Sequence, residues 1–259
     1  MKRVLTAAGL IPVIVYVVLW ADYWVFLTVL AAAACLCYRE YDGIAATYGF
    51  GAPGMVGYGA GLLVLAWRSD TWLLITGLAL LALALALRDG DLAKSLPRAA
   101  LLVTGIVYAF GCWKCAMGLR AASPHWLMYA LLVNWASDTG AYLVGRSFGR
   151  HKLAPRVSPS KSWEGAAAGV VSAVPVAGWY LLRFVNHVTV VEAIALTVAA
   201  NVAGQFGDLA ESAMKRGAGI KDSGAILPGH GGFLDRVDST LFALPVVYAY
   251  LKLMTPPLQ

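Results

Sequence analysis

The feature that most constrains the fold is a succession of apolar runs, each close to the length that a helix needs to cross a bilayer. Crossing the hydrocarbon core takes about 20 residues, with about 17 to 25 tolerated. Nine such runs occupy residues 4–20, 23–38, 54–67, 71–87, 98–119, 125–146, 164–184, 188–212 and 239–255. Hydrophobic residues make up 60% of the chain and charged residues only 13%, which is outside the usual range of soluble domains. The sequence therefore predicts an all-α, polytopic integral membrane protein with about nine transmembrane helices.

Lysine and arginine are distributed unequally between the two sides of this arrangement. Numbering the loops alternately places fifteen of them on the side of the N-terminus and four on the other side, with Lys114 inside a span. Cytoplasmic loops carry such an excess. We therefore expect a multi-pass protein of the cell (inner) membrane with a cytoplasmic N-terminus and two cytoplasmic polar loops. The basic residues form no tail or helix face that would indicate nucleic-acid binding.

Neither a repeat nor a linker divides the chain, so residues 1–259 are predicted to form a single membrane domain. Two patterns of small residues, Gly57 to Gly61 and Gly165 to Gly169, allow helix backbones to approach closely. Packing within the chain is the expected use of both patterns. A contact between two copies is the alternative.

Polar stripes run along two of the predicted spans. The first stripe consists of Asn134, Asp138, Tyr142 and Gly145. The second consists of Asn201, Gln205, Asp208, Ser212 and Lys215. Spacings of three and four residues keep each set on one helix face. A single polar residue in a span is explained by an interhelical hydrogen bond. Two stripes that lead into basic loops on the same side instead predict a polar cavity open to the cytoplasm.

The segments that follow the stripes combine cations with hydroxyl and carboxyl groups. Residues 145–165 contain Arg146, Arg150, Lys152, Arg156 and Lys161, with Ser158, Ser160 and Ser162. Residues 212–240 contain Lys215, Arg216, Lys221, His230 and Arg236, with Asp222, Asp235 and Asp238. Cations and hydroxyls favour a polyanion and carboxylates favour a divalent metal, while Gly231 and Gly232 allow backbone amides to approach a ligand. The excess of positive charge that is usual in cytoplasmic loops would explain the cations, but it would not explain the aspartates among them. The pattern predicts a phosphate site with bound Mg²⁺ at the membrane surface.

Residues 212–238 resemble the signature of the phosphatidate cytidylyltransferases, also called CDP-diglyceride synthetases. The matching pattern is S-x-x-K-R, then K-D, then P-x-H-G-G-x-x-D-R-x-D. The stretches DTGAY at 138–142, SPSKSWEG at 158–165 and GDLAES at 207–212 also resemble segments of this family. Residues 1–120 match only as apolar helices, as the variable half of the family does. Residues 125–255 are expected to supply the catalytic helices and cytoplasmic loops.

The resemblance implies a membrane enzyme, commonly dimeric, that uses Mg²⁺ and transfers the cytidylyl group of CTP to phosphatidic acid. We therefore expect a homodimer. Whether a second metal ion or a monovalent cation also takes part is left open. The predicted catalytic residues are Asp208, Ser212, Lys215, Arg216, Lys221, His230 and Arg236. The predicted substrate-binding residues are Asp138, Ser158, Ser160, Lys161, Ser162, Glu164, Gly231 and Gly232. The predicted metal ligands are Asp222, Asp235 and Asp238, with Asp208 and Asp138 as weaker candidates.

Two other functions remain open from the sequence. A CTP-dependent polyprenol or phytol kinase would share the nucleotide, the metal and a lipid substrate but would attack a different phosphorus. A transporter for an anionic substrate would also place charges in a cavity between helices. The internal repeat expected of such a transporter is absent from the sequence.

Overall fold

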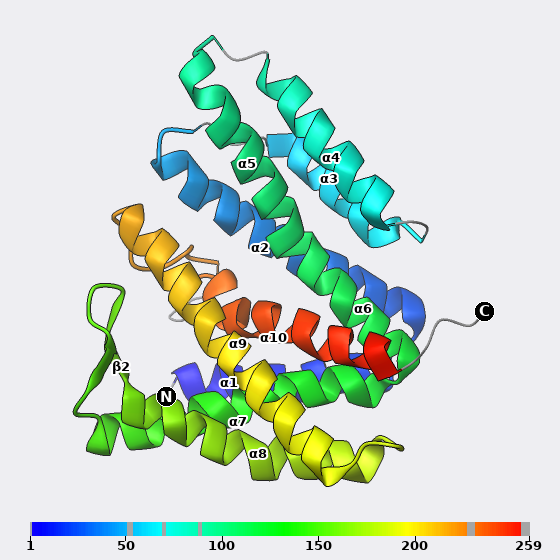
Figure 1. Cartoon of the computed structure of the whole chain (residues 1–259), viewed down its shortest axis with the longest axis vertical. Coiled ribbons are helices and arrows are strands. Elements are labelled where there is room, and N and C mark those ends of the chain that lie inside the picture. Colours follow the sequence, from blue (N-terminus) through cyan, green and yellow to red (C-terminus); the bar gives the residue numbers. More distant parts are fainter. Residues whose placement is uncertain (1, 51–53, 69–70, 88–89, 227–230, 255–259) are drawn as a thin grey trace.

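Helices account for nearly all of the fold, and Figure 1 shows their arrangement in a computed structural model that describes residues 2–50, 54–68, 71–87, 90–226 and 231–254. The first half contains α1 (Lys2–Leu19), α2 (Tyr23–Thr47), α3 (Gly54–Ala66), α4 (Thr71–Ala86), the short 3₁₀ helix η1 (Leu92–Lys94), α5 (Ser95–Ile106), the π-helical turn η2 (Val107–Gly111) and α6 (Cys112–Ala122). The second half contains α7 (Pro124–Phe148), α8 (Trp163–Phe184), α9 (Val190–Gly217) and α10 (Leu234–Met254). Between α7 and α8, β1 (Lys152–Ala154) and β2 (Ser158–Ser162) pair as an antiparallel hairpin.

Each of the nine predicted apolar runs overlaps a helix in the described part of the chain. Five helical stretches are long and apolar enough to cross a membrane, namely Tyr23–Thr47, Leu92–Ala122, Trp163–Phe184, Val190–Gly217 and Leu234–Met254. Three shorter apolar helices cover Gly9–Leu19, Gly54–Ala66 and Leu73–Ala86. The remaining helix, α7, is not among these stretches and carries the first polar stripe. The multi-pass helical class is confirmed, whereas the count of nine spans stays a prediction.

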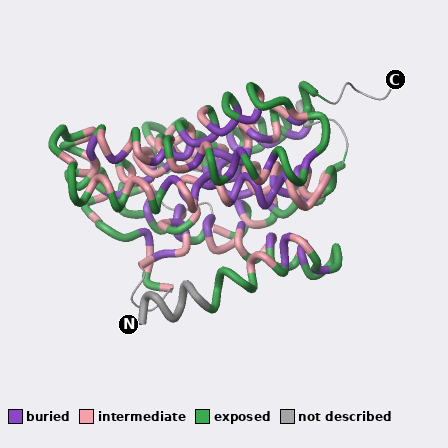
Figure 2. Tube along the Cα trace, turned by 90° about the horizontal axis from the view of Figure 1, so that it is seen from below, coloured by how far each residue is buried: buried purple, intermediate pink, exposed green. Residues whose placement is uncertain are grey.

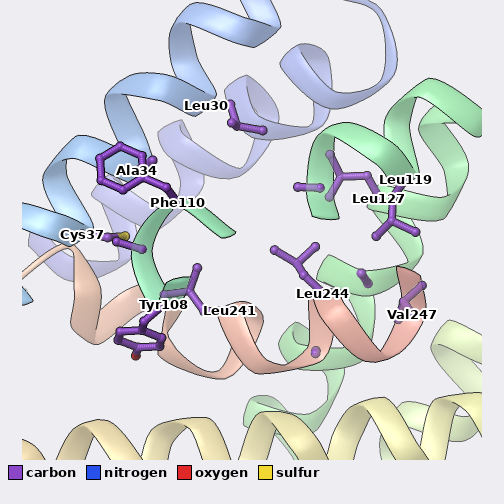
Figure 3. Close-up of a cluster of buried hydrophobic side chains, with 14 of the residues drawn as sticks. Leu30, Ala34, Cys37, Tyr108, Phe110, Leu119, Leu127, Leu241, Leu244 and Val247 are labelled. Carbon is purple, nitrogen blue, oxygen red and sulfur yellow. The ribbon is translucent and has the colours of Figure 1, made fainter. Parts of the chain in front are cut away.

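The outer surface of the helices is apolar. Figure 2 shows buried residues concentrated inside the helical layers and exposed residues along their outer faces. Trp24, Val171 and Trp179 are exposed by 73%, 72% and 64%. Apolar side chains of this size are costly in contact with water but suit contact with lipid tails. The interior cluster in Figure 3 joins α2, η2, α6, α7 and α10 through side chains such as Phe110 and Leu244.

Both patterns of small residues are used within the chain. A Cβ atom on Gly57 would lie 1.7 Å from Tyr38 Oη, and one on Gly61 would lie 2.1 Å from the Phe110 ring. On α8, a Cβ on Gly169 would lie 2.7 Å from Ser137 Oγ of α7. The expectation of intramolecular packing is therefore confirmed. The hairpin that joins α7 to α8 projects from the end of this helix pair and contacts α8 and α9 (Figure 1).

Three helices extend further than the sequence predicted, which corrects the placement of several charged residues. The second span was expected to end at residue 38, but α2 continues to Thr47. Its buried face runs on through Cys37, Tyr41 and Ile44 at helical spacing, so the charged residues between them do not end the helix. Similarly, α9 continues to Gly217 and α10 begins at Leu234. The helices therefore carry several residues that had been assigned to a loop, namely Lys215, Arg216, Asp235, Arg236 and Asp238.

Candidate active site

A cavity of about 480 Å³ lies between α7, α8, α9 and the hairpin. Both predicted polar stripes contribute to its wall. Its polar lining consists of Asn134, Ser137, Asp138, Tyr142, Arg146, Ser160, Lys161, Ser162, Gln205, Asp208 and Ser239. The two stripes thus meet at one cavity that is bordered by the cationic end of α7 and by the hairpin.

Two stripe residues also form the interhelical hydrogen bonds that were the simpler explanation. Asn201 Nδ2 donates to Gly169 O over 3.3 Å, and Gln205 Nε2 donates to Ala166 O over 3.0 Å. Gln205 also donates to Asn201 Oδ1 over 2.7 Å. These contacts fix α9 against α8 and leave the next stripe residue, Asp208, at the cavity.

Strand β2 brings Lys161 to this carboxylate. Lys161 Nζ lies 2.6 Å from Asp208 Oδ2, and Ser212 Oγ donates to Asp208 Oδ1 over 3.3 Å. The Lys161 and Asp208 side chains are 24% and 34% exposed, so an anion that enters the cavity can reach the ammonium group. The next residue, Ser162, caps α8 by accepting a hydrogen bond from Gly165 N over 3.1 Å, which ties the strand to the helix.

Glu164 holds the hairpin from the first turn of α8. Its carboxylate accepts hydrogen bonds from the backbone amides of Arg150 and His151, each over 3.2 Å, and lies 2.6 Å from His151 Nδ1. The predicted role of Glu164 in substrate binding stays a prediction, but the contacts present are those of a residue that shapes the hairpin. Among the other predicted residues here, Ser158 and Ser160 have their Oγ atoms 3.5 Å apart.

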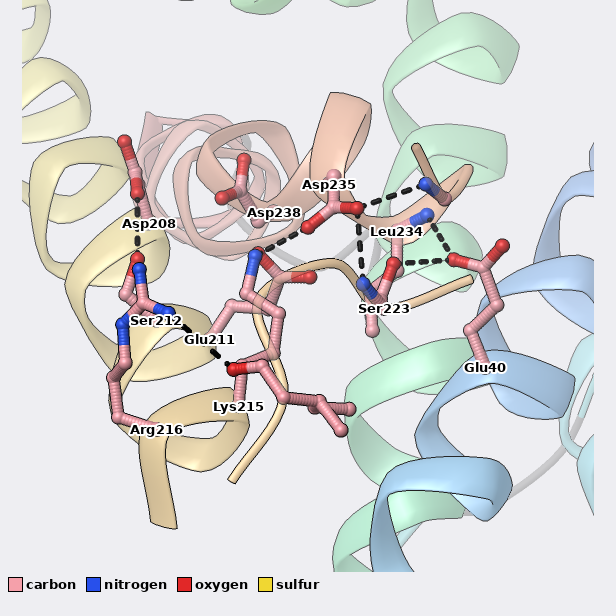
Figure 4. A network of polar contacts seen from close by, with 12 residues as sticks. Glu40, Asp208, Glu211, Ser212, Lys215, Arg216, Ser223, Leu234, Asp235 and Asp238 are labelled. Atoms are coloured by element: carbon pink, nitrogen blue, oxygen red, sulfur yellow. Dashed lines mark hydrogen bonds and ion pairs between the residues drawn. The ribbon is translucent and has the colours of Figure 1, made fainter. Parts of the chain in front are cut away.

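A second polar cluster lies where α9 meets the start of α10 (Figure 4). The Lys215 ammonium forms ion pairs with Glu211, at 2.8 Å, and with Asp235. The other oxygen of Asp235 accepts from Ser223 N over 3.0 Å and from Gly232 N over 2.8 Å. The Glu211 side chain is fully buried and that of Lys215 is 10% exposed. Lys215 and Asp235 therefore connect α9, the start of α10 and the segment between these helices through ion pairs and hydrogen bonds.

The sequence analysis missed Glu40, which completes this cluster from α2. Its carboxylate accepts from Ser223 Oγ over 2.6 Å, Phe233 N over 2.9 Å and Leu234 N over 2.7 Å. Glu40 lies outside the predicted site because the second span was expected to end before it. The helical period of the buried residues on α2 could have extended the helix, but nothing in the sequence indicated its partners.

The aspartates divide into two groups. Asp208 interacts electrostatically with both Asp138 and Asp238, next to the cavity. Asp222 and Asp235 instead lie near Gly231, where an added Cβ would be 3.4 Å and 3.0 Å from their oxygens. The described residues contain no group of three or more Asp, Glu, His or Cys side chains placed to hold a metal ion. Mg²⁺ is commonly bound by one or two carboxylates together with substrate phosphates. The candidates for such a site are Asp208, at the cavity wall, and Asp238, which interacts with Glu211 as well as with Asp208.

The remaining predicted residues lie at the surface or in the turn before α10. Lys221, Asp222 and Arg236 are exposed. Arg216 is exposed and its guanidinium donates to Val157 O and Ile220 O, each over 3.4 Å. His230 lies outside the described residues. Gly231 has φ of 78°, a conformation that favours glycine.

Together these features define a class of protein: a multi-pass helical membrane protein with a polar cavity whose wall carries the cations Lys161 and Arg146 and the carboxylates Asp138 and Asp208. Cations of this kind can bind a phosphate group. A sequence model of the cytidylyltransferase family matches residues 1–254, and the chain belongs to this family.

Curated relatives are similar over half of the chain. The phosphatidate cytidylyltransferase of Staphylococcus aureus (strain COL) is 46% identical over 130 residues, which are 49% of this chain and 49% of that protein. That of Bacillus subtilis (strain 168) is 46% identical over 130 residues, 50% of this chain and 48% of that protein. That of Staphylococcus haemolyticus (strain JCSC1435) is 45% identical over 130 residues, 49% of each. The chain spans about half the length of the curated relatives it matches.

Proposed function

We propose that this protein transfers the cytidylyl group of CTP to phosphatidic acid, giving CDP-diacylglycerol and pyrophosphate for phospholipid synthesis. The observation that carries the proposal is the cavity in which Lys161 pairs with Asp208, because it offers a reachable cation beside carboxylates suited to a divalent metal. Membership of the cytidylyltransferase family supports CTP as the nucleotide. The names of the relatives support phosphatidic acid as the acceptor.

In the proposed reaction, an oxygen of the phosphatidic acid phosphate attacks the α-phosphorus of CTP. A bond forms between these two atoms, and the bond from the α-phosphorus to the oxygen that bridges to the β-phosphorus breaks. Pyrophosphate leaves with that oxygen. The attacking oxygen is already anionic, so the protein needs no strong base. Its task is to align two polyanions that repel each other.

The residues at the cavity suit this task. Lys161 would exchange part of its contact with Asp208 for a phosphate oxygen, and Arg146, also at the wall, would neutralise a second phosphate. Ser160 would add a neutral hydrogen-bond donor. The backbone of these residues is held by β2 and by the end of α7, which would place their polar groups at the cavity where charge develops.

Mg²⁺ is part of the proposal, with Asp208 and Asp238 as the side chains that would hold it and Asp138 close by. When bound, the ion would supply positive charge to the phosphates and to the leaving pyrophosphate. Asp235 is less suited to this role because Lys215 and two backbone amides already engage both of its oxygens.

The proposed placement has about nine spans in the cell (inner) membrane, with the N-terminus and the cavity facing the cytoplasm. The excess of basic residues on one side supports it. The 28 residues of α9 extend about 42 Å, longer than a hydrocarbon core of about 30 Å, so the end with Lys215 and Arg216 would reach the membrane surface. A homodimer is proposed from the family resemblance. Native mass spectrometry of the detergent-solubilised protein would test it.

The test is an assay of purified protein with CTP labelled at the α-phosphorus, phosphatidic acid in mixed micelles and Mg²⁺. Label in the lipid phase together with released pyrophosphate is the expected result. Label that stays in CDP while the lipid gains an unlabelled phosphate would indicate a kinase instead. Uptake of a labelled anion by proteoliposomes without any lipid product would indicate a transporter.

A further inference from the structure

Glu40 is a carboxylate from the first half of the chain that is buried among residues of the second half. Only 4% of the residue is exposed. One oxygen accepts from Phe233 N, and the other accepts from Leu234 N and Ser223 Oγ. A Cβ on Gly224 or on Gly232 would lie 2.6 Å or 2.4 Å from its oxygens, so glycines enclose it on both sides. The three donors and the two glycines around Glu40 therefore form a close-fitting environment for its carboxylate.

In the described part of the chain, the partners of the Glu40 carboxylate are neutral hydrogen-bond donors. Within the described ranges no lysine, arginine or histidine forms an ion pair with it, and its partners are two backbone amides and a hydroxyl. Both amides come at the start of α10, where unpaired N–H groups and the helix dipole favour a negative charge. Glu40 therefore caps α10 from a distant helix.

Glu40 and Asp235 hold the same residue from two sides (Figure 4). Ser223 donates its hydroxyl to Glu40 and its backbone amide to Asp235. Asp235 in turn contacts Lys215 on α9. The first turn of α10 is consequently fixed by α2 on one side and by α9 on the other, and Asp238 follows directly after this turn.

We propose that Glu40 is a positioning residue for the cytidylyl transfer, an inference that rests on the proposed function. It contacts no part of the cavity wall and acts through Ser223 and the first turn of α10, setting where Asp238 stands relative to Asp208. The apolar first half of the chain thus contributes directly to the geometry of the site in the second half.

The test compares Glu40→Gln with Glu40→Ala, Ser223→Ala and the double variant Glu40→Gln/Ser223→Ala. Glutamine keeps the size of the side chain but has only one acceptor oxygen, so at least one amide of α10 loses its partner. We expect kcat to fall roughly 10- to 100-fold, since small misplacements of reacting groups have effects of this size. The KM values for CTP and phosphatidic acid should stay near those of the wild type. In the double variant the fall in kcat should be smaller than the product of the two single effects, because both changes disturb the contact between Glu40 and Ser223.

The matched control is Glu192→Gln. Glu192 is also a carboxylate in a capping contact, accepting from Thr189 N over 2.8 Å at the start of α9. It lies sixteen residues from Asp208 on the same helix, roughly 24 Å away. This variant should keep the wild-type kcat.

Amide hydrogen exchange supplies a readout that does not depend on activity. Exchange at Phe233 and Leu234 should be faster in Glu40→Gln than in the wild type and unchanged in Glu192→Gln. A wild-type kcat per folded molecule in Glu40→Gln would overturn the inference, as would unchanged exchange at these amides. If the wild-type protein forms no CDP-lipid, the proposed function fails by itself. In that case, amide hydrogen exchange at Phe233 and Leu234 still tests whether Glu40 stabilises the start of α10.

Discussion

Lys161 Nζ lies 2.6 Å from Asp208 Oδ2, and this contact joins the hairpin to α9 across the cavity. Both side chains remain partly exposed, so the ion pair is not fully buried. An anionic substrate can therefore compete with Asp208 for the ammonium group. Release of the carboxylate in the same step would leave Asp208 available to a divalent cation, which would couple the two parts of the proposed metal–phosphate site.

Replacing Lys161 by methionine keeps an unbranched side chain that is one atom shorter and removes its charge. We expect kcat/KM for CTP to fall by about 10²- to 10³-fold, because a preorganised group that stabilises developing charge is lost. Lys161→Arg should retain part of the activity. The control is Lys152→Met, which removes an exposed lysine of the same hairpin outside the cavity lining. Initial rates at varied CTP measure the effect, and equal losses in both methionine variants would contradict the placement of Lys161.

Replacing Lys215 by methionine should mainly reduce stability. The change leaves the buried carboxylate of Glu211 and that of Asp235 without their cation, which typically costs about 3–5 kcal/mol. Denaturant unfolding in detergent measures the change. Adding Glu211→Gln should recover part of the loss. In the exposed pair of Lys94 with Asp91, at 3.7 Å, the matched Lys94→Met change should cost only about 0–1 kcal/mol. Similar losses for the two lysines would show that the Lys215 cluster is not buried as described.

The helices and the joint cavity could be predicted from the sequence because both depend on local periodicity. Apolar runs of a given length indicate helices, and polar residues at intervals of three and four indicate one face. Asp138 and Asp208 therefore reach the same cavity as expected. Composition was a poorer guide to where a helix ends. Charged residues follow Tyr38 on α2, yet its buried face continues to Ile44, because packing rather than charge decides the boundary.

The contacts across α2 and α10 could not be predicted from the sequence. Glu40 and Leu234 are distant in the chain, and their hydrogen bond arises from the way the helices pack. The same reason explains why the aspartates of residues 212–238 looked equivalent in the sequence. In the structure Asp235 is engaged by Lys215, whereas Asp238 interacts electrostatically with both Asp208 and Glu211. Tertiary contacts, which residue spacing does not determine, assign them different surroundings.

Gly232 is expected to tolerate no larger side chain. A Cβ atom there would lie 1.9 Å from Ser223 Oγ and 2.4 Å from Glu40 Oε2. Gly232→Ala should therefore lower the free energy of unfolding by about 1–3 kcal/mol, the usual cost of overpacking. The control is Gly43→Ala in the interior of α2, where an added Cβ has nothing within 4 Å. There alanine should stabilise the helix by about 0.5–1 kcal/mol. Thermal unfolding of both variants measures the difference, and a neutral Gly232→Ala would contradict the tight packing around Glu40.

The metal dependence should separate the aspartates of the site. Chelation by EDTA should abolish cytidylyl transfer, and added Mg²⁺ should restore it. In Asp208→Asn and Asp238→Asn, the Mg²⁺ concentration that gives half the maximal rate should rise by at least roughly 10-fold, since even changes outside the ligands have effects of that order. Asp235→Asn should leave this concentration unchanged and lower the unfolding temperature, because Asp235 already accepts from Lys215 and two amides. The reverse pattern would place the metal at Asp235.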